Sequence, residues 1–172
     1  RQVMKLYTTA VAPNPRRVTI FLAEKGIDVP VEEVDIGNSK HLEPDFVAKN
    51  PMARVPVLEM DDGSYLSESL AICRYFEEIQ PDPPLFGVDA RDKAEVEMWN
   101  RRMEFEVLGM ISQCFRNTHP YWEGRIPQVP EHGELCRATV MKRMEWLDAE
   151  LADREFIAGD RFTVADITAH TG

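Results

Sequence analysis

The chain has 172 residues, 44% of them hydrophobic and 9% aromatic, which suits a folded core and excludes a disordered chain. Acidic side chains number 30 and basic ones 20, and the net charge of −10 argues against binding to nucleic acid or anionic membranes. No stretch approaches the roughly 20 apolar residues of a membrane span. The three cysteines and four histidines lack disulfide or metal-ligand spacing, so we expect a cytoplasmic protein with reduced thiols and no metal.

Strand and helix patterns alternate at the start of the chain. Residues 3–7 predict a strand, and Asn14 followed by Pro15 predicts a helix that begins with Asn14 as its N-cap. Gly26 is suited to end this helix, and residues 29–36 predict a second strand. A strand, a helix and a strand in this order favour a parallel pair.

A hairpin and a further helix follow. Residues 55–60 and 64–66 predict two strands, and the turn over 61–63 is short enough to require antiparallel pairing. Ser67 then predicts the N-cap of an apolar-striped helix. We therefore expect a small mixed sheet of four strands with helices on its faces.

Three prolines in residues 81–84 forbid a continuous helix there and indicate a linker. Beyond it, residues 90–117 and 134–151 predict long helices, and Thr163 with Asp166 forms a capping-box pattern at the start of another. The domains we expect are residues 1–79, with the mixed sheet; residues 80–89, a linker; and residues 90–172, an all-α domain that is incomplete at its C-terminus.

Four sequence motifs, taken in their order along the chain, carry a family resemblance. They are Ala-Pro-Asn-Pro-Arg-Arg-Val at 12–18, Asn-Pro-Met-Ala-Arg-Val-Pro-Val-Leu at 50–58, Ser-Glu-Ser-Leu-Ala-Ile-Cys-Arg-Tyr at 67–75 and the segment 156–167. Together they resemble those of the cytosolic, bacterial-like glutathione S-transferases, across nearly the whole chain. The resemblance implies a thioredoxin-like N-terminal domain, an all-α C-terminal domain, glutathione as co-substrate and a homodimer.

Glutathione carries two carboxylates, an amine and a thiol. Ser69 and Glu68 stand at a predicted helix N-terminus, where free N–H groups favour a carboxylate. The resemblance implies that Ser69 receives the γ-glutamyl carboxylate and Glu68 the γ-glutamyl amine. The alternative is that both residues only begin the helix.

The resemblance also implies a cis peptide between Val55 and Pro56, which lets the Val55 backbone pair with the cysteinyl part of glutathione. It assigns Arg54 and His41 to the glycyl carboxylate, although both also fit a plain solvated surface.

The position that activates the thiol departs from the family pattern. Many relatives place a serine, and others a cysteine, four residues before an arginine, but Ala12 stands four residues before Arg16 here. A methyl group donates no hydrogen bond to a thiolate. Asn14 is the candidate substitute, unless it serves only as a helix cap. Other nearby hydroxyl donors are Thr8, Thr9 and, more weakly, Tyr7.

We expect the pocket for the electrophile between the domains, with walls from Ala10 and Val11 and from Met103, Val107 and Met110. The methionine stripe has the alternative of lying in the core or a dimer interface.

The predicted function is a glutathione transferase that acts on small apolar electrophiles. The alternatives are a glutathione-dependent disulfide reductase or peroxidase, and a non-catalytic protein that binds glutathione or another protein.

Overall fold

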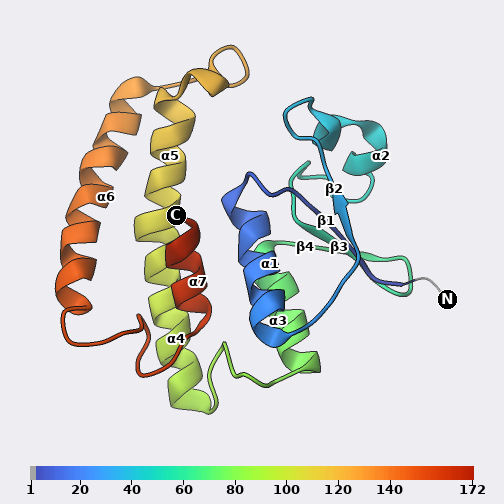
Figure 1. The fold of residues 1–172 in the computed structure, drawn as a ribbon. Coiled ribbons are helices and arrows are strands. Elements are labelled where there is room, and N and C mark those ends of the chain that lie inside the picture. The colour runs from blue at the N-terminus through green and yellow to red at the C-terminus, as the bar shows by residue number, and fades with distance from the viewer. Residues whose placement is uncertain (1–2) are drawn as a thin grey trace. The chain divides into compact units, whose positions relative to one another are not determined.

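The computed structural model describes residues 3–172, which form two compact units that meet in sequence at Pro84 and Leu85 (Figure 1). The first unit contains one sheet with the strand order β2-β1-β3-β4. Its strands are β1 (Lys5–Thr8), β2 (Val31–Glu33), β3 (Val57–Glu59) and β4 (Tyr65–Ser67).

The strand directions bring several chain ends together. β1 and β2 are parallel, whereas β3 is antiparallel to both β1 and β4. Tyr7 pairs with Val57, and Val57 pairs with Ser67. The carboxyl ends of β1, β2 and β4 and the amino end of β3 therefore lie along one side of the sheet, which we call the common edge. The mixed four-stranded sheet confirms the fold class expected from the sequence.

Two helices of this unit pack against each other, α1 (Pro13–Lys25) and α3 (Ser69–Ile79), and two short ones follow β2, η1 (Lys40–Leu42) and α2 (Pro44–Val47). α1 ends at Gly26, whose φ of 65° belongs to the left-handed region that glycine adopts readily. The buried apolar residues of the unit include Leu6, Val18, Phe21, Leu58, Ile72 and Phe76.

Lys25 connects the carboxyl ends of α1 and α3 with the segment that follows α3. Its buried ammonium lies 2.5 Å from Glu77 Oε2 and donates to the carbonyl oxygens of Gln80 (2.8 Å), Pro81 (3.2 Å) and Pro83. Because the ends of both helices meet at Lys25, α1 and α3 run parallel. Their N-termini therefore lie at the same end of the helix pair.

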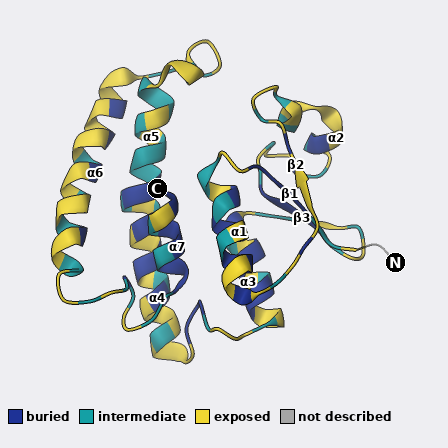
Figure 2. Ribbon diagram, in the orientation of Figure 1, coloured by how far each residue is buried: buried dark blue, intermediate teal, exposed yellow. Residues whose placement is uncertain are grey.

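The second unit is helical. It comprises α4 (Ala90–Arg102), a π-helical segment (Met103–Leu108), α5 (Gly109–Thr118), η3 (Pro120–Trp122), α6 (Pro130–Glu150) and α7 (Val164–Thr171). Trp99 of α4 stacks on Trp146 of α6 with ring centroids 5.6 Å apart. Figure 2 shows that one side of α6 is mostly exposed while α7 is largely buried. No helix within residues 3–172 is both long and apolar enough to cross a bilayer.

The capping box at Thr163 and Asp166 is present as predicted. Other element boundaries differ from the expectations. The strand predicted over 29–36 covers only Val31–Glu33, and α6 begins at Pro130, because proline is well tolerated in the first turn of a helix. The helix predicted over 90–117 is interrupted by the π-helical segment.

Candidate functional site

The common edge gathers most of the predicted glutathione-binding residues. Val55 and Pro56 immediately precede β3, and Glu68 and Ser69 immediately follow β4. Since Val57 pairs with Ser67, these two dipeptides lie next to each other. The connection from β1 to α1, which includes Ala10 and Asn14, leaves the sheet from the same edge.

The N-terminus of α1 offers few hydrogen-bond donors. Its N-cap is Ala12, no side chain caps it, and Pro13 and Pro15 have no N–H. The Arg16 N–H donates to the Ala12 carbonyl at 3.3 Å. The backbone N–H of Asn14 is thus the one donor of the first turn that the helix itself does not use.

Asn14 is the second residue of α1, so the expectation that it is the N-cap is wrong. The reason is that Pro13, with its fixed φ, fits the first helical position and moves the cap to Ala12. The Asn14 side-chain oxygen accepts a hydrogen bond from Arg17 Nη1 at 3.3 Å. This contact orients the amide and does not use its two N–H groups, which are the atoms that can donate to an anion.

Ser69 begins α3 and is only 7% exposed. The N-cap is Glu68, with a φ of 72° that is rare for a residue other than glycine, and no side chain caps the helix. Ser67 is therefore not the cap that the sequence predicted. Such strained backbone tends to persist at binding sites, and because α3 begins directly after β4, its uncapped N–H groups lie at the common edge.

The segment before β3 is held by Asn50, a residue that the sequence analysis did not single out. The side chain of Asn50 is 3% exposed, donates to the Arg54 carbonyl at 2.8 Å and accepts from the Met52 N–H at 3.1 Å. Arg54 itself is exposed. The peptide between Val55 and Pro56 is cis, as the resemblance implied.

Replacing Asn50 by alanine should lower the free energy of unfolding by about 1–3 kcal/mol, because two backbone groups lose their buried partner. Urea unfolding followed by circular dichroism measures the change. Asn38→Ala is the control, since the amide of Asn38 bonds to Asp35 on the exposed surface. An equal loss in the two variants would contradict this role for Asn50.

Near the end of β1, the side-chain hydroxyl groups either donate a hydrogen bond to another side chain or are buried. Thr9 donates its hydroxyl hydrogen to Glu33 Oε1 at 2.8 Å, so it is removed as a donor to the thiol in this arrangement. Tyr7 donates to Glu59 at 2.7 Å, and burial together with this bond raises the pKa of Tyr7 well above its ordinary value. Thr8 is 6% exposed, and its hydroxyl has no hydrogen-bond partner in the described part of the chain.

His41 lies in η1, on the connection that leads from β2 through Arg54 to β3. Burial lowers the pKa of His41 below its ordinary value, so the imidazole is neutral at pH 7. A neutral ring can still donate one hydrogen bond to a carboxylate, but it brings no charge. Of the two residues that the resemblance assigns to the glycyl carboxylate, Arg54 is therefore the one that carries a positive charge. Residues 3–172 contain no group of three or more side chains suited to hold a metal ion.

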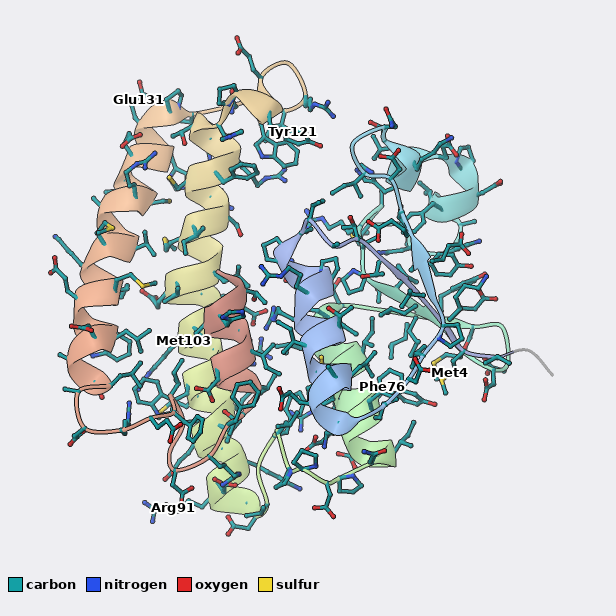
Figure 3. The ribbon with its side chains drawn as sticks, viewed as in Figure 1. Met4, Phe76, Arg91, Met103, Tyr121 and Glu131 are labelled. Carbon is teal, nitrogen blue, oxygen red and sulfur yellow. The ribbon has the colours of Figure 1, made fainter. Side chains whose placement is uncertain are left out.

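The predicted electrophile-binding residues divide into two groups. Ala10 and Val11 are exposed in the first unit. Met103 and Val107 are fully buried in the core of the helical unit, packed with Trp99 and Val140 among others, so they do not line a pocket. This is the outcome that the sequence left open as the alternative. Met110 packs against the same core but stays partly exposed, and Figure 3 labels Met103 within the helical unit.

Three positioning residues escaped the sequence analysis: Asn50, Glu33 and Arg17. Asn50 precedes a proline, and an asparagine side chain often stabilises a turn by accepting a hydrogen bond from the backbone N–H two residues later. The sequence therefore contained a local indication of the role of Asn50. The contacts of Glu33 with Thr9 and with the Ala10 N–H depend on strand register and had no local signal. Arg17 is 2% exposed and donates a hydrogen bond to Asn14, whereas an arginine side chain is usually expected at the protein surface.

Both halves of the chain match one family of known proteins. Residues 11–79 match the N-terminal domain of glutathione S-transferase, and residues 99–171 match its C-terminal domain. The chain is 36% identical to Glutathione S-transferase 2 of Saccharomyces cerevisiae over 176 residues, which covers 100% of this chain and 76% of the yeast protein.

Solved structures agree as well. A glutathione S-transferase domain-containing protein of Marinobacter aquaeolei is 40% identical, with a TM-score of 0.89 over 97% of this chain and 83% of that one. Human glutathione transferase theta-2, solved in complex with glutathione, is 26% identical, with a TM-score of 0.85 over 98% of this chain and 70% of that one. On these matches, and with its thioredoxin-like and helical domains in the same order, the chain belongs to the glutathione S-transferase family of enzymes.

Proposed function

We propose that the protein conjugates reduced glutathione to small apolar electrophiles. The observation that carries the proposal is the pair of parallel helices, α1 and α3, whose uncapped N-termini meet the common edge beside Arg54. A ligand with two carboxylates and a thiol finds two helix N-termini and a cation there.

In this proposal Ser69 and the free N–H groups of α3 bind the γ-glutamyl carboxylate, and Glu68 accepts from the amine. The backbone of Val55, ahead of Pro56, pairs with the cysteinyl residue. Arg54 binds the glycyl carboxylate, and this carboxylate also accepts a hydrogen bond from His41.

The thiol is activated at the start of α1. The Asn14 amide and its backbone N–H donate to the sulfur, aided by the positive end of the helix dipole. The thiol proton leaves to solvent, and the thiolate attacks the electrophilic carbon. A carbon–sulfur bond forms as a leaving group departs or as the activated double bond takes up a proton.

We retain Ala10 and Val11, which are exposed in the first unit, as contacts for the electrophile, and we leave out Met103 and Val107 because they are buried. We also expect a cytoplasmic homodimer, which light scattering after gel filtration would test. The three free cysteines are consistent with a reducing compartment.

Rates with an aryl halide, an organic peroxide and a mixed disulfide distinguish the reactions. Turnover of the aryl halide supports the transferase. Turnover of only the peroxide or the disulfide would replace it by a peroxidase or a reductase, and glutathione binding without any turnover would indicate a binding protein.

The replacement Asn14→Ala should raise the pKa of the bound glutathione thiol by about 1–2 units, since a hydrogen bond to a charged group is worth about 1.5–3 kcal/mol. The ultraviolet absorbance of the thiolate, followed as the pH rises, measures this. Asn14→Asp is the isosteric comparison and should raise the pKa at least as far, because it removes both donors and adds a negative charge. An unchanged thiol pKa in both variants would limit the role of the Asn14 side chain to its hydrogen bond with Arg17.

A further inference from the structure

Two of the three free cysteines lie on helices that pack against each other, Cys114 on α5 and Cys136 on α6. We propose that these two thiols form a redox-active pair, which closes a disulfide between α5 and α6 when the protein meets glutathione disulfide. The proposal concerns the helical unit alone and does not depend on catalysis at the common edge.

At Gly133 the two helices pack tightly against each other. A Cβ atom placed on Gly133 would collide with Thr118 Cγ2, and it would lie 3.1 Å from Asn117 Cβ and 3.4 Å from the carbonyl oxygen of Cys114. A side chain at this position would therefore push α6 away from α5. A disulfide requires Cα atoms about 4.4–6.8 Å apart, and a close helix crossing favours such a separation.

Both cysteines stand one turn from this crossing, on the same side of it. α5 and α6 lie side by side and run in opposite directions, joined by the connection that contains Tyr121 (Figures 1 and 3). Cys136 follows Gly133 by three residues and Cys114 precedes Asn117 by three, so each is displaced by about 4.5 Å along the helices. Because the helices run in opposite directions, Cys114 and Cys136 lie at the same height along the helix pair.

The surroundings of the two sulfurs differ and suggest different roles. Cys114 Sγ lies 3.9 Å from Oγ1 of Thr118, the residue whose methyl group meets Gly133, so this sulfur is on the α6 side of α5. The residue is partly exposed, which lets a small disulfide reach it. Cys136 is 3% exposed, and its Sγ lies 3.6 Å from Nε2 of the exposed His132.

These roles give a balanced two-step exchange. The Cys114 thiolate attacks one sulfur of glutathione disulfide, forming a mixed disulfide and releasing one glutathione thiolate. His132 then accepts the proton of Cys136, and the Cys136 sulfur attacks the Cys114 sulfur. The second glutathione leaves as a thiolate and takes up that proton. The two protein thiols are oxidised, and one glutathione disulfide is reduced to two molecules of glutathione.

Cys73 provides a matched control within the same chain. It is completely buried in α3, and burial raises the pKa of its thiol to about 12. Cys73 therefore remains a protonated thiol under conditions in which an accessible cysteine exchanges.

The test treats the folded protein with excess glutathione disulfide, removes the reagent, then unfolds the protein, alkylates the remaining thiols and digests the product with trypsin. Cleavage after arginine places Cys114 in peptide 103–116, Cys136 in peptide 126–137 and Cys73 in peptide 55–74. We expect mass spectrometry to find the first two peptides linked, with the mass of the pair lower by two hydrogen atoms, and Cys73 alkylated.

Three variants assign the roles. Cys73→Ser should leave the link unchanged. Cys136→Ser should stop the reaction at a glutathione attached to Cys114, and Cys114→Ser should abolish the link while Cys136 stays unmodified. The proposal is overturned if Cys114 and Cys136 remain alkylated as free thiols in the wild type, if the link involves Cys73, or if glutathione attaches to Cys136 in the Cys114→Ser variant. These readouts are peptide masses, so failure of the proposed transferase activity would not affect them.

Discussion

Replacement of Ser69 by alanine should weaken the binding of reduced glutathione about 10- to 100-fold. Ser69 is nearly buried at the first position of α3, where no side chain caps the helix, and in the proposed complex its hydroxyl donates to a carboxylate. A hydrogen bond to a charged group contributes about 1.5–3 kcal/mol, and about 1.4 kcal/mol corresponds to a factor of ten in affinity. Isothermal titration calorimetry with glutathione measures the effect.

Ser67→Ala is the matched control for this experiment. Ser67 lies two residues earlier, at the end of β4, and does not cap the helix, so its loss should leave the affinity within about twofold of the wild type. Thermal unfolding checks that both variants are folded. If both serines affect affinity equally, or if Ser69→Ala binds normally, the carboxylate is not bound at the start of α3.

The replacement Lys25→Met should lower the free energy of unfolding of the first unit by about 3–5 kcal/mol, the usual cost of removing one partner of a buried ion pair. The ammonium has no exposed side-chain surface and contacts the Glu77 carboxylate and three carbonyl oxygens. Methionine has a similar length and cannot donate to any of these oxygens. Urea unfolding followed by circular dichroism measures the loss.

Lys40→Met is the control, because the pair of Lys40 with Glu43 lies on the surface with about half of each side chain exposed, and it should change stability little. The double variant with Lys25→Met and Glu77→Leu should recover part of the loss, since it removes the buried carboxylate together with its cation. Near-wild-type stability of Lys25→Met would show that the segment after α3 is held by other contacts.

Much of the fold could be predicted because its signals are local. Gly26 ends α1, Thr163 and Asp166 begin α7, and the turn after β3 requires a hairpin. Ser69 could also be placed at a helix start, since it directly precedes a strong apolar stripe. The exact cap was less predictable, because Pro13 and Pro15 are both acceptable early in a helix and only the structure distinguishes them.

The side-chain partners within the candidate site depend on contacts that are distant in sequence. Thr9 meets Glu33 and Tyr7 meets Glu59 across 24 and 52 residues, and only the strand register determines these pairs. Helical spacing placed Met103 and Val107 on a stripe, but spacing alone does not say whether a stripe faces a core or a ligand. These positions therefore needed the packed structure.

The stacked Trp99 and Trp146 have a practical consequence for spectroscopy. The chain has three tryptophans, these two and Trp122, and all of them follow Leu85, whereas the residues up to Pro84 contain tyrosine but no tryptophan. Indole emission excited at the red edge of the absorption band reports on the helical unit alone. Tryptophan fluorescence therefore reports on the helical unit without an added fluorophore. It can follow changes at Cys114 and Cys136 with no tryptophan emission from the thioredoxin-like unit.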